Sequence, residues 1–238
     1  MRAITLLFFL FLFQIPEGQA QVEETIEPEY IRTIQFKGAS SQSKLPIIEL
    51  GQKLQLSFDD IIGNEADYFY TIEHFNFDWT PSDLSKGEYL DGFDDVRIET
   101  YENSFNTLQL YSNYKLSIPN RETRAIKKSG NYLLRIFNDD GEIVFSRKFM
   151  VLERVLSVEV EIKRSRIIKN IDQQQVVQFK INSPNLLLIN PKQNVKTLVL
   201  QNNNLKTAIT NLKPLYTIGS ELIYKYDQEA AFWGGNEF

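Results

Sequence analysis

Apolar and polar residues alternate with a period of two along much of the chain. The alternation is clearest over residues 54–58, 68–73 and 114–118, and Leu108 and Leu110 start a similar run that we assign to one long strand or two. Strands with one face on a core and the other in water produce this pattern. No segment carries a helical stripe of apolar residues longer than one or two turns. The pattern predicts an all-β fold.

Residues 130–151 predict a β-hairpin. Two apolar runs flank the turn sequence Asn138-Asp139-Asp140-Gly141. Asp-Gly is a favoured pair for a type I′ turn, in which both central residues have positive φ. A turn centred on this pair predicts the following cross-strand neighbours: Ile136 with Phe145, and Tyr132 with Phe149.

The alternation restarts beyond residue 153, where the composition moves from Asp, Tyr and Phe towards Asn, Gln, Lys and Ile. Residues 158–162 and 177–181 again read as strands. About five strands are predicted in this part, whereas sandwich domains usually contain about seven. We therefore expect two consecutive Ig-like or fibronectin-like β-sandwich domains, residues 21–153 and 154–238, of which the second is incomplete in this chain.

The first twenty residues have the pattern of a secretory signal peptide. Arg2 precedes an apolar stretch from Ile4 to Phe13, and Gly18-Gln19-Ala20 supplies small residues for cleavage. The stretch is too short to span a bilayer, which requires about 20 apolar residues. We expect a mature chain that starts near Gln21, is exported to the periplasm and has no direct membrane span.

Composition narrows the class of protein further. An apolar fraction of 42% excludes a disordered chain, and a net charge of −5 argues against binding to nucleic acid. The chain has no cysteine, so disulfide bonds cannot hold an exported domain together and packing has to do so. Two basic clusters, residues 121–128 and 163–169, are interpreted as solvated turns.

An acidic segment interrupts the strand pattern between residues 78 and 102. It contains eight acidic residues and two basic ones, together with Trp79, Tyr89 and Phe93. We expect an ordered surface excursion that packs back on its own sheet. A Ca²⁺ site is one alternative, because Ca²⁺ accepts flexible carboxylate ligands. A sugar-stacking platform on Trp79 is another.

His74 is the only histidine. Without cysteine the usual ligand set of a structural zinc site is missing, and no G-x-S-x-G sequence places a nucleophile. A triad with Ser57 and Asp59 is formally possible, but a hydrogen-bonded histidine at a strand end is the favoured interpretation. The paired acids Asp59-Asp60 and Asp139-Asp140 are better explained by opposite strand faces and by a turn. We expect no enzyme, no metal and no cofactor.

Several runs, taken in order, resemble the plug protein family of the type IX secretion system of Bacteroidetes. The runs are SFDD at 57–60, YFYTIEHFNFDWTPSDL at 68–84, EYLDGF at 88–93, SFNT at 104–107, SGNYL at 129–133, RKFMV at 147–151, QN at 201–202, KP at 213–214 and GGNEF at 234–238. They extend over nearly the whole mature chain.

This resemblance implies a periplasmic, non-catalytic β-sandwich protein that binds the outer-membrane translocon barrel and closes its periplasmic end. Family members continue beyond the GGNEF run, which agrees with an incomplete second domain. No catalytic residue is carried over. For the contact with the barrel we single out four residues of the acidic segment: Trp79, Tyr89, Asp91 and Phe93. Two other hypotheses remain open, an exported carbohydrate-binding sandwich and a hydrolase built around His74.

Overall fold

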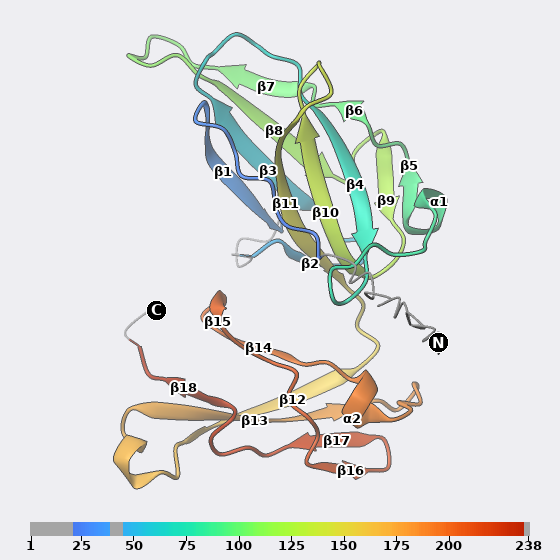
Figure 1. Cartoon of the computed structure of the whole chain (residues 1–238), viewed down its shortest axis with the longest axis vertical. Coiled ribbons are helices and arrows are strands. Elements are labelled where there is room, and N and C mark those ends of the chain that lie inside the picture. Colours follow the sequence, from blue (N-terminus) through green and yellow to red (C-terminus); the bar gives the residue numbers. More distant parts are fainter. Residues whose placement is uncertain (1–20, 39–44, 236–238) are drawn as a thin grey trace, which may run out of the picture.

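The structure is a computed structural model that describes residues 21–38 and 45–235; the expected signal peptide lies outside these residues. It shows two β-rich bodies in succession, joined by residues 153–156 (Figure 1). In residues 21–38 and 45–235, helical structure is confined to α1 (Lys86–Tyr89), α2 (Pro191–Asn194) and the 3₁₀ turn Ile168–Asn170. The predicted all-β fold with sandwich architecture is confirmed. Within the described residues, no helix is long and apolar enough to cross a bilayer.

The first body consists of two main sheets and a small third one. The first sheet has the order β1 (Ile31–Gly38), β3 (Leu54–Asp60), β8 (Ser112–Ile118) and β7 (Thr100–Asn103). The second has the order β2 (Ile47–Glu49), β11 (Ile143–Leu152), β10 (Gly130–Phe137), β4 (Phe69–Phe75) and β6 (Val96–Arg97). The third pairs β5 (Leu90–Gly92) with β9 (Thr123–Ile126).

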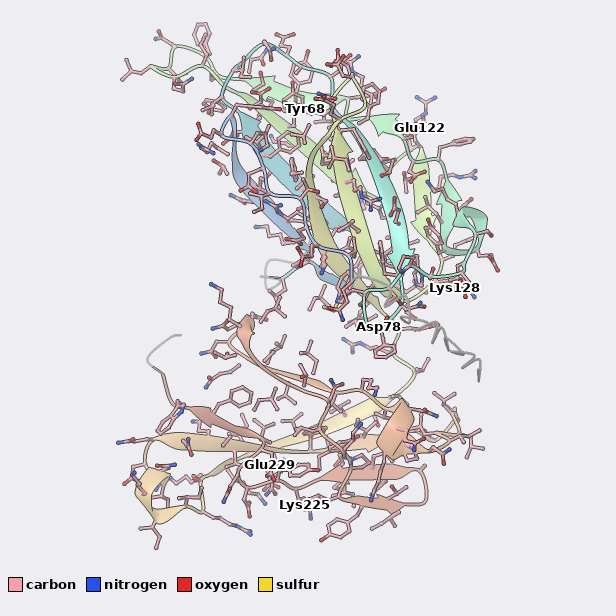
Figure 2. All side chains as sticks on the ribbon, in the orientation of Figure 1. Tyr68, Asp78, Glu122, Lys128, Lys225 and Glu229 are labelled. Atoms are coloured by element: carbon pink, nitrogen blue, oxygen red, sulfur yellow. The ribbon has the colours of Figure 1, made fainter. Side chains whose placement is uncertain are left out.

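Aromatic side chains from both main sheets fill the space between them. Phe58 stacks on Tyr114 with ring centroids 5.2 Å apart, and meets Phe145 of the facing sheet edge-on at the same distance. Two of the buried tyrosines between these sheets illustrate how a buried hydroxyl finds a partner: Tyr68 donates to Asp60 at 2.9 Å and Tyr132 to the Lys128 carbonyl at 2.7 Å. Figure 2 shows Tyr68 inside one end of this body.

The 130–151 hairpin forms with the expected register but a different turn. The predicted pairs, Ile136 with Phe145 and Tyr132 with Phe149, are confirmed. The type I′ turn is wrong, because Gly141 is the only residue of 138–141 with positive φ. Its N–H donates to the Asn138 carbonyl at 3.1 Å, and the Asn138 side chain accepts from the Glu142 N–H at 2.8 Å. These bonds select a longer turn, and a bulge after Ile136 absorbs the extra residue.

The second body contains more strands than the sequence pattern indicated. One sheet has the order β12 (Ser157–Arg164), β13 (Gln174–Asn182), β17 (Glu221–Tyr224) and β16 (Tyr216–Ile218), with β18 (Ala231–Trp233) also paired to β13. The other pairs β14 (Leu198–Gln201) with β15 (Asn204–Thr210). The expectation of about five strands is therefore too low. The strands that it missed are short, or are polar like β15, so their apolar signal is weak.

The apolar face of β12 is exposed, which the sequence did not predict. Val158 and Val160 pair with Ile181 and Phe179 of β13, and directly paired antiparallel residues point to the same face of the sheet. That face carries the core on β13, where Phe179 is 6% exposed. On β12, Val160 is 60% exposed. The second core therefore ends at β13, and the neighbouring edge strand continues its apolar face into solvent.

Candidate functional site

The acidic segment 78–102 is built into the first body rather than forming one irregular excursion. After the turn that follows β4, it forms α1 and β5, and then adds β6 beside β4 and β7 beside β8. One continuous stretch of chain therefore supplies an edge strand to each of the three sheets of this body. Short pieces of two to four residues carry no readable period, which explains why the alternation seemed to stop here.

Local hydrogen bonds position α1 against the sheet. Ser85 and Glu88 form a capping box, in which the Glu88 carboxylate accepts from the Ser85 N–H at 2.7 Å. The hydrogen bonds from Ser85 lower the pKa of Glu88. Lys86 contacts Asp94 at 2.7 Å, and the same carboxylate accepts from the backbone N–H of Ile72 in β4 at 2.9 Å. A side chain thereby satisfies a strand-edge donor where the short β6 does not reach.

Basic residues of the 119–130 connection meet this acidic segment. Arg124 of β9 forms an ion pair with Asp91 of β5 at 2.7 Å, and Lys127 donates to the Gly87 carbonyl. Figure 2 places Glu122 and Lys128 along the same side of the first body. The basic cluster is therefore more than a solvated turn. Among residues 21–38 and 45–235, no group of three or more His, Cys, Asp or Glu side chains has the geometry of a metal site.

Tyr89 ends α1, Asp91 lies in β5 and Phe93 follows β5 directly, and the three residues differ in exposure. Tyr89 is 5% exposed, its hydroxyl donates to the Ile72 carbonyl at 3.3 Å, and burial raises its pKa. Asp91 is half-buried. Phe93 is 71% exposed, while its backbone N–H is fixed by the Glu122 carbonyl at 2.9 Å. Of the three, Phe93 exposes the most apolar surface to solvent. Tyr89 attaches the segment to β4 through its buried hydroxyl.

Trp79 lies at the start of the acidic segment, in the turn after β4. Asp78 shapes this turn by accepting from the Thr80 side chain at 2.7 Å, and these bonds to Thr80 lower the pKa of Asp78. The half-buried Trp79 ring has the Lys148 ammonium 4.5 Å from its centroid. A cation over the ring stabilises the indole and occupies one of the faces that a sugar would need.

His74 lies near the end of β4 and contacts both neighbouring loops. Its Nδ1 lies 2.7 Å from the Ser82 hydroxyl, and its Nε2 lies 3.4 Å from the Ser129 carbonyl. Because a carbonyl can only accept, Nε2 carries the proton and Ser82 donates to Nδ1. The ring stacks on Tyr89 at 5.6 Å, and burial lowers its pKa.

This arrangement differs from a catalytic triad in a specific way. A triad histidine has a carboxylate on the nitrogen that does not face the nucleophile, whereas His74 has a backbone carbonyl there. Ser57 and Asp59 lie on β3, in the other main sheet. An open hollow of about 470 Å³ adjoins His74, lined in part by Val22 and Leu84. His74 therefore links two loops through hydrogen bonds.

Gly130 is fitted to the same imidazole ring. It has φ of 148°, in the region that favours glycine, and a Cβ on this residue would collide with Nε2 of His74. The start of β10 and the end of β4 approach closely enough for Ser129 to accept from the ring. The absence of a side chain at position 130 is what permits this contact.

The sequence pattern also missed an exposed apolar loop. Residues 104–111, hereafter the apolar tip, connect β7 to β8 and project from the end of the first body opposite to residues 153–156 (Figure 1). Leu108 and Leu110 were expected in a strand, but β8 begins only at Ser112. Phe105 is 93% exposed and Leu108 fully exposed. The lack of charged residues from 103 to 114 was the signal available in the sequence.

Comparison with known proteins identifies the family. Residues 31–153 match the model of the type 9 secretion system plug protein 1st domain. A crystal structure of a hypothetical protein from Parabacteroides merdae is similar with a TM-score of 0.83 and 32% sequence identity, over 92% of this chain. The chain spans 56% of the length of that protein. None of the curated proteins compared with it matches. Since the family model covers more than half of its residues, the chain belongs to the type 9 secretion system plug proteins, a family of structural, non-catalytic domains.

Proposed function

We propose that this protein is a periplasmic plug that binds the outer-membrane translocon barrel of the type 9 secretion system and closes its periplasmic end. The observation that carries the proposal is the family match over residues 31–153, which coincides with the densely packed first body. Export by residues 1–20 would deliver the chain to the side of the membrane where such a plug acts.

The physical properties of the first body suit steric obstruction. A barrel wide enough for folded cargo leaks small solutes unless a rigid object fills its opening. Interdigitated aromatic side chains between two sheets give low compressibility and a fixed shape. Loops at the ends of a sandwich are free to supply docking contacts without disturbing this core.

For one docking region we retain the four residues of the acidic segment, with different roles. Phe93 offers exposed apolar surface and Asp91 a partly exposed charge. Tyr89 holds the junction of α1 and β5 against β4, because its hydroxyl donates to the Ile72 carbonyl. Trp79 would form a separate contact at the turn after β4. We also retain residues 21–153 and 154–238 as the proposed domains, with the boundary between β11 and β12.

Affinity purification of the barrel from cells tests the proposal. The barrel is purified from cells that carry a tagged copy of this protein, and the co-purified tag is quantified. An exported sandwich protein outside the secretion system, tagged in the same way, provides the background. Recovery well above this background is expected, and recovery at background would contradict the proposal. A large antibiotic that normally cannot cross the outer membrane adds a second readout, because cells without the plug should become more sensitive to it.

A further inference from the structure

The apolar tip exposes large apolar side chains at the far end of the first body. Phe105 is 93% exposed, Leu108 is fully exposed and Leu110 is 58% exposed. Ile62, in the neighbouring β3–β4 connection, adds a fourth side chain at 54%. Single exposed apolar residues are ordinary, whereas a group of them on a projecting loop marks an interaction site.

Hydrogen bonds hold the tip in one conformation. The Ser104 N–H donates to the Tyr111 carbonyl at 2.8 Å, and the Tyr111 N–H donates to the Ser104 hydroxyl at 2.9 Å. The Gln109 side chain donates to the Ile61 carbonyl at 2.8 Å, which ties the tip to the β3–β4 connection. Because the loop is already ordered, a partner that binds it has less conformational entropy to remove.

Charge distinguishes the kinds of partner. The tip itself carries no charged residue. Near its base, the charges of Asp67 and Glu102 are balanced by ion pairs with Arg97 and Lys115, so the acidic character there comes from Glu65. Glu65 accepts from the neutral donors Tyr101 and Asn103, at 3.0 and 2.5 Å, so these contacts do not cancel its charge. The β10–β11 turn at the same end adds exposed Asp139 and Asp140 (Figure 1).

This distribution disfavours a lipid surface. Loops and helices that bind membranes combine apolar side chains with Lys or Arg, which attract anionic headgroups. An acidic base would instead be repelled as the tip approached. An apolar pocket on a protein, with basic residues around its rim, matches both the tip and its base.

We propose that the apolar tip inserts into an apolar pocket with a basic rim on the protein that this plug binds. The inference rests on the proposed function, since it supplies a contact surface for the same partner. Phe105 and Leu108 are the anchors, because they present the most exposed aromatic and aliphatic groups of the tip. Glu65 and the β10–β11 turn guide approach through charge.

The test uses the tagged full chain and the barrel co-purification described above. The variant Phe105→Ser/Leu108→Ser removes both anchors from the tip. A matched control, Ile168→Ser/Leu187→Ser, removes two similarly exposed side chains, 88% and 84%, from the second body. Thermal unfolding of the purified variants checks folding, which exposed substitutions should leave unchanged. The tip variant should recover the barrel at about one tenth of the wild-type level or less, as for loss of a binding anchor, and the control at the wild-type level.

Each other outcome has a distinct meaning. Wild-type recovery of the barrel by the tip variant overturns this inference and leaves the proposed function standing. Failure of the wild-type chain to recover the barrel overturns the proposed function and the inference with it. Flotation with vesicles of phosphatidylcholine, alone or mixed equally with phosphatidylglycerol, provides a separate arm. Flotation of the wild type but not of the tip variant would assign the tip to a lipid surface and overturn the protein pocket.

Discussion

The two bodies of this protein use the same alternating pattern but achieve different degrees of burial. Among the described residues, the core cluster of the first body contains 22 buried apolar side chains and that of the second contains six. In the first body both sheets are broad enough to cover each other. In the second, the exposed face of β12 shows that the β14–β15 hairpin does not cover the whole facing sheet. Alternation therefore specifies a strand and its faces, whereas burial depends on what lies opposite.

The largest effect is expected in the aromatic core of the first body. Phe58→Ala removes a ring that is 1% exposed and contacts aromatic rings of both sheets. The free energy of unfolding should fall by about 3–5 kcal/mol, since the cavity cannot collapse between two rigid sheets. Urea denaturation followed by tyrosine fluorescence measures this change. A loss below about 1 kcal/mol would contradict the dense packing that distinguishes the first body.

A smaller loss is expected from the corresponding change in the second body. Phe179 stacks on Tyr224 with ring centroids 4.3 Å apart and is 6% exposed, but it lies next to the uncovered β12. Phe179→Ala should destabilise the protein by about 3 kcal/mol, at the low end of the range for such truncations. Limited proteolysis that detects cleavage within residues 154–235 measures it separately. A loss larger than that of Phe58→Ala would reverse the comparison.

Acid should weaken the first body through its single histidine. Burial lowers the pKa of His74 in the folded protein, so the unfolded chain binds a proton more readily. The stability that depends on a neutral His74 is fully present above the ordinary pKa of 6.5 and is lost as the pH falls below that value. Thermal unfolding is measured at a series of pH values for the wild type and for His74→Gln. The difference between the two proteins separates the effect of the histidine on stability from the effect of the carboxylates, which both proteins share. An identical pH dependence in both proteins would contradict the prediction.

The smallest effect is expected on the open face of β12. Val160→Thr keeps a β-branched side chain and changes a position that is 60% exposed. Unfolding free energy should change by less than about 0.5 kcal/mol, as for most surface substitutions. The same denaturation experiment measures it, with Phe179→Ala as the buried reference on the paired strand. A loss above about 1 kcal/mol would mean that this face is covered in solution.

Interactions between neighbouring residues were predictable from the sequence, and those set by distant chain segments were not. The hairpin register followed from the position of Asp-Gly, because strand pairing propagates from the turn. The structural interpretation of His74 agrees with its contacts, since a strand end next to two loops offers hydrogen-bond partners. In contrast, the side-chain bond of Asn138 changed the turn type without changing the register.

Exposure was the quantity that the sequence predicted least well. Tyr89 and Phe93 occur in the same acidic segment, yet the side chain of Tyr89 is buried and that of Phe93 is exposed. The difference arises from β4, whose Ile72 carbonyl receives the Tyr89 hydroxyl from 17 residues away. Leu108 and Leu110 satisfied the strand period, but they precede β8 and their side chains are exposed. The period of apolar residues alone predicts neither the distant hydrogen-bond partner of Tyr89 nor the exposure of the two leucines.

The fit between Gly130 and His74 has a consequence for how sequences of this fold can diverge. Any side chain at position 130 needs the space that the imidazole occupies. A replacement there first requires a smaller residue at position 74, which would in turn leave Ser82 and the Ser129 carbonyl without their shared partner. Position 130 is therefore closed to substitution while the imidazole is in place, so divergence at this contact has to begin at position 74.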